Sequence, residues 1–118
     1  MASERPVAQL KAQLFKALAH PVRIRALEQL VEGERSVGEL AESIGTEISH
    51  LSQQLAVLRK AGVVDTRREG NTVFYSVRDT RLAVLLATAR AMLVSNLQES
   101  TALLARLEEE NVAQAADR

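Results

Sequence analysis

The spacing of apolar residues changes abruptly near the middle of this 118-residue chain. In one stretch they recur every three or four residues, which is the spacing of a helix with one buried face: Ile48, Leu51, Leu55 and Leu58. Two β-prone runs follow at once, over 63–68 and 72–77, and Gly70 and Asn71 between them supply the positive φ of a tight turn. We therefore predict a helix over 46–61 that leads directly into a β-hairpin.

Helical spacing also governs the rest of the chain. The first predicted helix spans 7–18, and the second begins at Pro21, directly after His20, because proline suits the first turn of a helix. A short helix is predicted over 37–44 and a long one over 80–112. These patterns give four helices, a hairpin and a last helix.

A short helix, a glycine turn and a second helix with a polar outer face form a helix-turn-helix, and a hairpin directly after it makes a winged helix. The chain is therefore expected to be mainly α with a small β-hairpin, in the order ααααββα. We expect one winged-helix domain over 1–118, in which the helix over 80–112 serves dimerisation. The segments 1–6 and 112–118 are expected to be flexible.

Composition narrows the class of protein. Lysine and arginine together number 15, as do aspartate and glutamate, so the formal net charge is zero; DNA binding depends on how these charges are distributed. The absence of cysteine excludes disulfides, thiolate metal sites and cysteine nucleophiles. Because the sequence has neither an acid–base constellation nor a phosphate-binding glycine loop, we do not expect an enzyme. No apolar run approaches the roughly 18 residues of a membrane span, and we expect a cytoplasmic protein without a membrane partner.

The outer face of the helix over 46–61 carries short hydrogen-bonding side chains that can enter a major groove. The candidates for DNA contact are Ser49, His50, Ser52, Gln53 and Gln54. Glutamine can pair with adenine, and serine can bond to bases or phosphates. Ser52 lies at the edge of the apolar stripe and therefore suits a phosphate better than a base. An ordinary solvated helix face has a similar composition, and that alternative stays open.

The hairpin offers three further candidates for DNA contact, Arg67, Arg68 and Asn71. An arginine on a hairpin can reach phosphates or a minor groove. Because side chains alternate along a strand, we expect one of the two arginines to make the main contact. The alternative is a hairpin whose charges only protect an edge strand from aggregation.

Three motifs in this chain resemble those of ArsR/SmtB-type repressors. They occur in the family's order: KALAHPVRIRAL over 16–27, LSQQL over 51–55 with LRKAGVV over 58–64, and RREGN over 67–71 with Tyr75. The first resembles the opening signature, the second the recognition helix and its exit, and the third the wing. The resemblance covers about residues 14–79. It implies a homodimeric winged-helix repressor that binds a palindromic operator and is released from DNA by a metal ion or another inducer.

The metal ligands of that family do not carry over to this chain. The resemblance places the cysteines of one sensing site at Ser36 and Gly38, neither of which is a thiolate. It places the ligands of the other site at Asp79, Arg81, Met92 and Ser95. An arginine offers no lone pair, and one carboxylate does not bind a transition metal tightly. We expect no cofactor and no metal at these positions. An atypical divalent site stays open, with His20 as its candidate ligand.

Apolar residues of the first and last helices exceed what one small winged domain covers. We expect the following to form the interface of a homodimer: Leu10, Leu14, Leu82, Leu86, Met92, Leu93 and Leu97. Two recognition helices about one DNA turn apart supply the specificity that a single helix lacks.

The predicted function is therefore a sequence-specific, effector-controlled repressor that binds double-stranded DNA as a homodimer. A winged-helix module for protein interactions is the alternative, favoured by the zero net charge and an acidic C-terminal segment. The effector stays open between a small molecule, a metal at an atypical site and a separate sensor protein.

Overall fold

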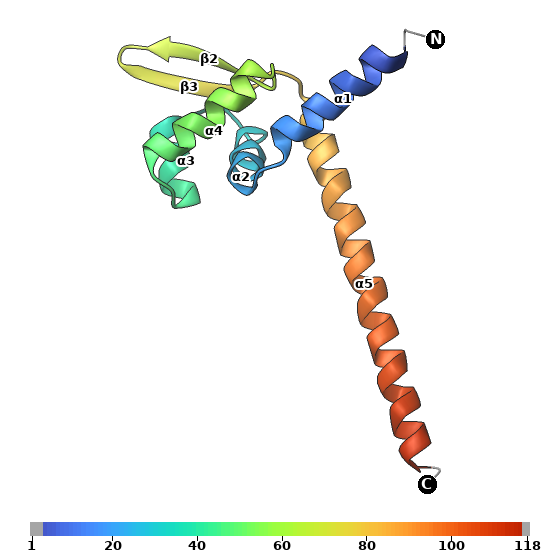
Figure 1. Cartoon of the computed structure of the whole chain (residues 1–118). Coiled ribbons are helices and arrows are strands. Elements are labelled where there is room, and N and C mark those ends of the chain that lie inside the picture. Colours follow the sequence, from blue (N-terminus) through green and yellow to red (C-terminus); the bar gives the residue numbers. More distant parts are fainter. Residues whose placement is uncertain (1–3, 117–118) are drawn as a thin grey trace. The chain divides into compact units, whose positions relative to one another are not determined.

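A computed structural model describes residues 4–116, which form five helices and three strands (Figure 1). The elements in chain order are α1 (Glu4–Leu18), α2 (Pro21–Leu30), β1 (Arg35–Ser36), α3 (Val37–Ile44), α4 (Ile48–Lys60), β2 (Val64–Glu69), β3 (Thr72–Val77) and α5 (Arg81–Ala116). The predicted helices and hairpin are all present, and β1 is an additional element. Of the two segments predicted to be flexible, residues 1–3 and 117–118 lie outside the described residues. The rest of both segments is helical, so α5 extends past the predicted end at 112.

Local side-chain contacts fix where the helices begin. His20 has an extended backbone before Pro21, and its Nδ1 accepts a hydrogen bond from the backbone N–H of Val22 at 3.1 Å. At α3, the Ser36 hydroxyl accepts from the Glu39 N–H while the Glu39 carboxylate accepts from the Ser36 N–H, which is a capping box. Helix α4 begins after Glu47, whose side chain makes no capping bond.

The strands form one antiparallel sheet in the order β1-β3-β2. Because β1 has only two residues, it is too short to produce an alternating pattern, and the sequence predicted a two-stranded hairpin without it. In the hairpin, Glu69 pairs with Thr72 across a two-residue turn. Gly70 has a φ of 61° and no non-glycine residue of the described chain has a positive φ, so the glycine alone supplies it. The prediction that Asn71 shares this role was wrong.

Side chains from four elements make the centre of the core. The largest fully buried residues come from α2, α3, α4 and β2: Leu27, Leu40, Leu51, Leu55, Leu58 and Val64. Burying one such side chain stabilises the fold by about 1.5–3 kcal/mol. Half of this set belongs to α4, so the core fixes that helix on its inner face.

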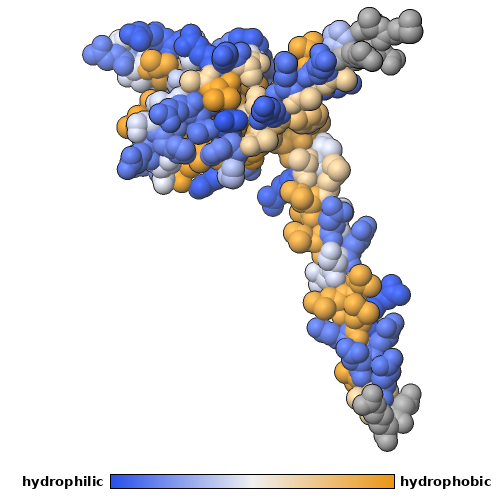
Figure 2. All heavy atoms as spheres, viewed as in Figure 1, coloured by the Kyte–Doolittle hydropathy of each residue, from blue (hydrophilic) through white to orange (hydrophobic). Residues whose placement is uncertain are grey.

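The chain divides into two compact units near residue 83. The first unit contains α1 to α4 and the sheet. The second consists of α5 from residue 84 onward. Apolar and polar residues are interspersed along this helix (Figure 2). Among the described residues, none of the helices is long and apolar enough to cross a membrane.

Candidate DNA-binding interface

Helix α4 is anchored by one face only. Leu51, Leu55 and Leu58 are completely buried, as predicted. The fourth apolar residue of the stripe, Ile48, is 54% exposed, so the prediction that it faces the core was wrong. The reason is positional: α4 begins at Ile48, and the side chain extends from the end of the helix, past the residues that the core covers.

The outer face of α4 carries the polar side chains that the sequence marked as DNA contacts. Ser49, His50 and Gln53 are exposed, and Ser52 is half-buried. Within residues 4–116, no hydrogen bond engages the side chain of Ser49, Ser52 or Gln53. Their donors and acceptors are therefore free to bond to another molecule. Contact with DNA stays a prediction for these residues.

Gln54 lies on the flank of α4 that faces α2, and its side chain is used inside the protein. The Nε of Arg23 donates to Gln54 Oε1 at 2.8 Å, and the Nη1 of Arg23 donates to the carbonyl of Ala17 at 3.1 Å. Arg23 thus joins the end of α1 to α4. Its carbonyl oxygen therefore already has a partner inside the protein, while contact of the Gln54 side-chain NH2 with DNA stays a prediction.

The two histidines, 30 positions apart in the sequence, lie next to each other. The ring centroids of His20 and His50 are 6.1 Å apart, with an angle of 55° between the ring planes. The Nδ1 lone pair of His20 accepts the N–H of Val22, so this nitrogen cannot bind a metal while it caps α2. The prediction that His20 marks the start of a helix is confirmed.

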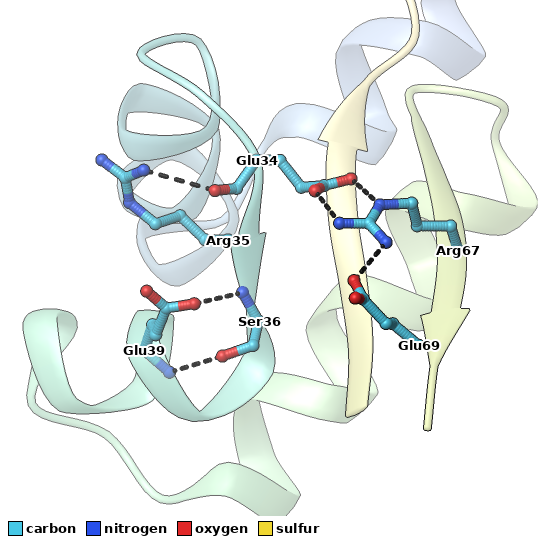
Figure 3. Close-up of polar contacts among 6 residues, drawn as sticks. All are labelled: Glu34, Arg35, Ser36, Glu39, Arg67 and Glu69. Carbon is cyan, nitrogen blue, oxygen red and sulfur yellow. Dashed lines mark hydrogen bonds and ion pairs between the residues drawn. The ribbon is translucent and has the colours of Figure 1, made fainter. Parts of the chain in front are cut away.

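Arg67 is held by Glu34, the residue before β1, and by Glu69 on its own strand β2 (Figure 3). Its Nε and Nη2 donate to the two carboxylate oxygens of Glu34 at 2.7 and 2.6 Å, and its Nη1 donates to Glu69 at 2.8 Å. The guanidinium carbon lies 4.6 Å from the ring centroid of Phe74, the residue opposite on β3. These bonds, above all those that Arg67 donates to Glu34, raise the pKa of Arg67 further above its ordinary value. The hydrogen bond from Arg67 in turn lowers the pKa of Glu34.

Arg68 and Asn71 are exposed and differ from Arg67 in their surroundings. Arg68 follows the alternation of β2 onto the face that carries the buried Val64, which is the face that packs against the helices. Within the described residues, no ion pair or hydrogen bond engages the Arg68 side chain. Asn71 lies in the hairpin turn, which extends past α3 and α4 in Figure 1. Of the two arginines, Arg68 is therefore the one free to meet an external phosphate.

The side chains at the first implied metal site have other roles. Ser36 belongs to the capping box of α3, and its hydroxyl accepts the Glu39 N–H at 3.2 Å (Figure 3). Gly38 has no side chain to offer. This pair does not fit a metal ion.

An ion pair occupies the second implied metal site. The Nη2 of Arg81 lies 2.7 Å from Oδ2 of Asp79, and the backbone N–H of Arg81 donates to Oδ1 at 2.9 Å. These bonds, the side-chain bond first, lower the pKa of Asp79 to about 2. Met92 and Ser95 are exposed on α5. Within the part of the chain that the structure describes, no group of three His, Cys, Asp or Glu residues could hold a metal.

Most of the predicted dimer residues are exposed apolar side chains. Leu10, Leu14, Met92, Leu93 and Leu97 are exposed, and Leu86 is half-buried. Leu82 is only 8% exposed within a single chain. It therefore belongs to the core of one protomer, and we correct its assignment as an interface residue. For the others, the dimer interface stays a prediction.

Comparison with known proteins identifies the family. Residues 20–66 match the family described as bacterial regulatory protein, arsR family. The chain is 56% identical over 100 residues to the HTH-type transcriptional regulator Rv0081 of Mycobacterium tuberculosis, which covers 84% of this chain and 88% of that protein. The chain belongs to the ArsR family. Its members are transcriptional regulators and not enzymes. This ArsR-family chain is also 49% identical over 75 residues to the biofilm growth-associated repressor of Xylella fastidiosa, over 64% of this chain and 66% of that one.

Solved structures of relatives have the same fold. The crystal structure of Rv0081 matches with a TM-score of 0.74 at 55% identity, over 81% of this chain and 97% of that one. The homodimeric winged helix-turn-helix DNA-binding domain Mb0332 of Mycobacterium bovis, solved by NMR, matches with a TM-score of 0.73 at 29% identity, over 81% and 89%. The predicted winged helix-turn-helix fold is therefore confirmed.

Sequence reasoning missed Glu34 and Arg23, although both decide which side chains of the interface are free. Glu34 is 33 positions from Arg67, and Arg23 is 31 positions from Gln54. Neither pair has a helical or strand spacing, so no local pattern could have linked them. Only the pairing of β1 with β3 and the packing of α2 on α4 bring them together.

Proposed function

We propose that this ArsR-family chain is a homodimeric repressor that binds a two-fold symmetric DNA operator through α4 and the β2–β3 hairpin. The outer face of α4 is the observation that carries the proposal. Ser49, His50 and Gln53 are exposed there, while buried leucines fix the opposite face. In a helix-turn-helix the N-terminal residues of the second helix reach the base edges of the major groove. Ser49 and Gln53 are one turn apart and serve as the direct readout pair.

The hairpin supplies the backbone contacts in this proposal. Arg68 and Asn71 bind phosphate or the edge of a minor groove, where a positive charge is favourable. Arg67 acts differently, since its ion pairs with Glu34 and Glu69 tie the hairpin to the residue before β1. Arg67 is thus a positioning residue of the hairpin.

Two copies of the chain associate through apolar side chains of α1 and α5. Leu10, Leu93 and Leu97 are each more than 60% exposed in one copy, which is unfavourable in water. The homodimeric relative Mb0332 supports this assembly. A two-fold dimer presents two equivalent recognition helices, so the operator is a palindrome with half-sites about one DNA turn apart.

The effector of this repressor acts at residues other than the two implied metal sites. The support for this is chemical. Arg81 forms an ion pair with the Asp79 carboxylate, and the Ser36 hydroxyl caps α3, so both groups already have partners within the chain. A small molecule, a metal at an atypical site or a separate sensor protein fits the proposal. Because its target is DNA, we propose a cytoplasmic location.

The test is a salt titration of DNA binding. The full chain is titrated onto a duplex from the region upstream of its own gene and onto a scrambled duplex, between 50 and 200 mM salt, with and without a panel of divalent metals. We expect selective binding that weakens steeply with salt, because phosphate contacts release counterions. Equal affinity for both duplexes, or no binding, would contradict the proposal and favour a winged-helix module for protein interactions. A metal effect would reveal an atypical site.

A further inference from the structure

Ile48 is a large apolar side chain that lies outside both the core and the predicted dimer interface. It is the first residue of α4 and is 54% exposed, while the next three apolar residues of its stripe are completely buried. No other large apolar side chain in the first two turns of α4 is exposed. The protein thus presents one branched apolar side chain at the end of the helix that is proposed to enter the major groove.

The neighbours of Ile48 indicate what kind of partner it meets. Ser49 and Ser52, one and four positions further along α4, are short and polar and flank the isoleucine. A docking site for another protein needs a contiguous apolar patch, whereas here a single apolar side chain lies among hydrogen-bonding ones. The major groove offers the matching arrangement, because the C5-methyl group of thymine projects among its hydrogen-bonding base edges.

We propose that Ile48 determines sequence specificity by packing against the C5-methyl group of one thymine in each operator half-site. The position supports this, since the N-terminal residues of a recognition helix contact base edges. The short side chains of Ser49 and Ser52 let the isoleucine approach the base closely. This inference rests on the proposed function, and it adds a specificity contact that hydrogen-bonding residues cannot supply.

Replacement of thymine by uracil tests the proposal directly, because deoxyuridine keeps the base pair and removes only the methyl group. Footprinting of the upstream duplex first locates the operator. Each of its thymines is then replaced in turn in both half-sites. We expect one position at which the wild-type protein loses affinity, by about fourfold per methyl group, since burying one such group corresponds to that factor. With both half-sites altered, the expected loss is about 15-fold.

The variant Ile48→Ala should abolish this response. It should bind the thymine operator about as weakly as the wild type binds the uracil operator, and it should no longer distinguish the two. Val57→Ala is the matched control, since Val57 is also exposed on α4 but lies in its third turn. This control should keep the wild-type response to uracil. Thermal unfolding followed by circular dichroism should be unchanged for Ile48→Ala, because the side chain is exposed.

The outcomes are distinct. A wild-type protein that binds the operator but shows no loss at any uracil, or an Ile48→Ala variant that keeps the wild-type loss, would overturn the role of Ile48. A wild-type protein that fails to bind any duplex selectively would instead overturn the proposed function itself. A variant Ile48→Ala that binds every uracil duplex more weakly than the wild type by the same factor, including the duplex that lacks the contacted methyl group, would also count against a methyl contact.

Discussion

The two wing arginines are neighbours in the sequence, yet the same substitution should change the salt dependence of DNA binding at only one of them. Arg67 is held by Glu34 and Glu69 through three hydrogen bonds of 2.6–2.8 Å, while Arg68 is exposed and has no ion-pair partner within the described residues. Arg68→Ala should therefore remove a phosphate contact. Arg67→Ala should leave the number of phosphate contacts unchanged.

Counterion release sets how much Arg68→Ala should change the salt dependence of DNA binding. Each phosphate that a protein neutralises contributes about −0.9 to the slope of log affinity against log salt concentration. Arg68→Ala removes one contact from each protomer, so the slope of the dimer should become shallower by about 1.8. When the salt concentration rises fourfold, the fold-loss of affinity should therefore be about ten times smaller for the variant than for the wild type.

The assay is fluorescence anisotropy with a labelled operator at several salt concentrations from 50 to 200 mM. Arg67→Ala is the matched control, since it removes the same charge from the adjacent position. It should weaken binding by loosening the hairpin while the slope stays at the wild-type value. The reasoning is refuted if Arg67→Ala flattens the slope and Arg68→Ala does not, because Arg67 would then leave Glu34 to bind DNA.

Four further outcomes follow from the structure. Gln53→Ala should lose about 1–3 kcal/mol of discrimination between operator and scrambled DNA, measured by competition binding. Leu55→Ala should lower the free energy of unfolding by about 2–5 kcal/mol in urea titrations, because this side chain is completely buried. Leu93→Glu should give monomers in sedimentation velocity if α5 forms the dimer interface, and a persisting dimer would place the interface elsewhere. The carboxyl of Glu34 should titrate below 4.5 by NMR, and Arg67→Ala should return it to that ordinary value.

The last of these outcomes also sets a pH dependence. The pKa of Glu34 is lower in the folded protein than in the unfolded chain because Arg67 bonds to the charged form. Unfolding therefore takes up a proton at this group, and the pair stabilises the fold fully above pH 4.5. The contribution is lost as the pH falls through the folded-state pKa of Glu34.

Strong local signals allowed the sequence to predict most of the fold. The periodicity of α4, the proline at the start of α2 and the glycine in the hairpin turn each act within a few residues, so each could be recognised without a structure. The strand β1 had no such signal. It consists of two residues, and it exists because Arg35 and Ser36 pair with Tyr75 and Phe74 far along the chain.

The candidate site was predictable as a region but not residue by residue. The polar face of α4 and the basic hairpin could be recognised from residue types alone. The sequence did not reveal the surroundings of Gln54, Arg67 and Ile48 for one shared reason: those surroundings depend on where other elements end or pack. Arg23 donates a hydrogen bond to Gln54, and Arg67 forms an ion pair with Glu34. Ile48 lies outside the core because α4 begins at this residue.

The winged helix-turn-helix and the polar outer face of α4 could be predicted from the sequence, because periodicity, caps and turns are properties of neighbouring residues. Which of those polar and charged side chains are free depends on contacts that form only when the chain folds. Ion pairs such as Arg67–Glu34 and hydrogen bonds such as Arg23–Gln54 join residues more than 30 positions apart. Folding brings such partners together, and each pair then uses donors and acceptors that would otherwise be open to DNA.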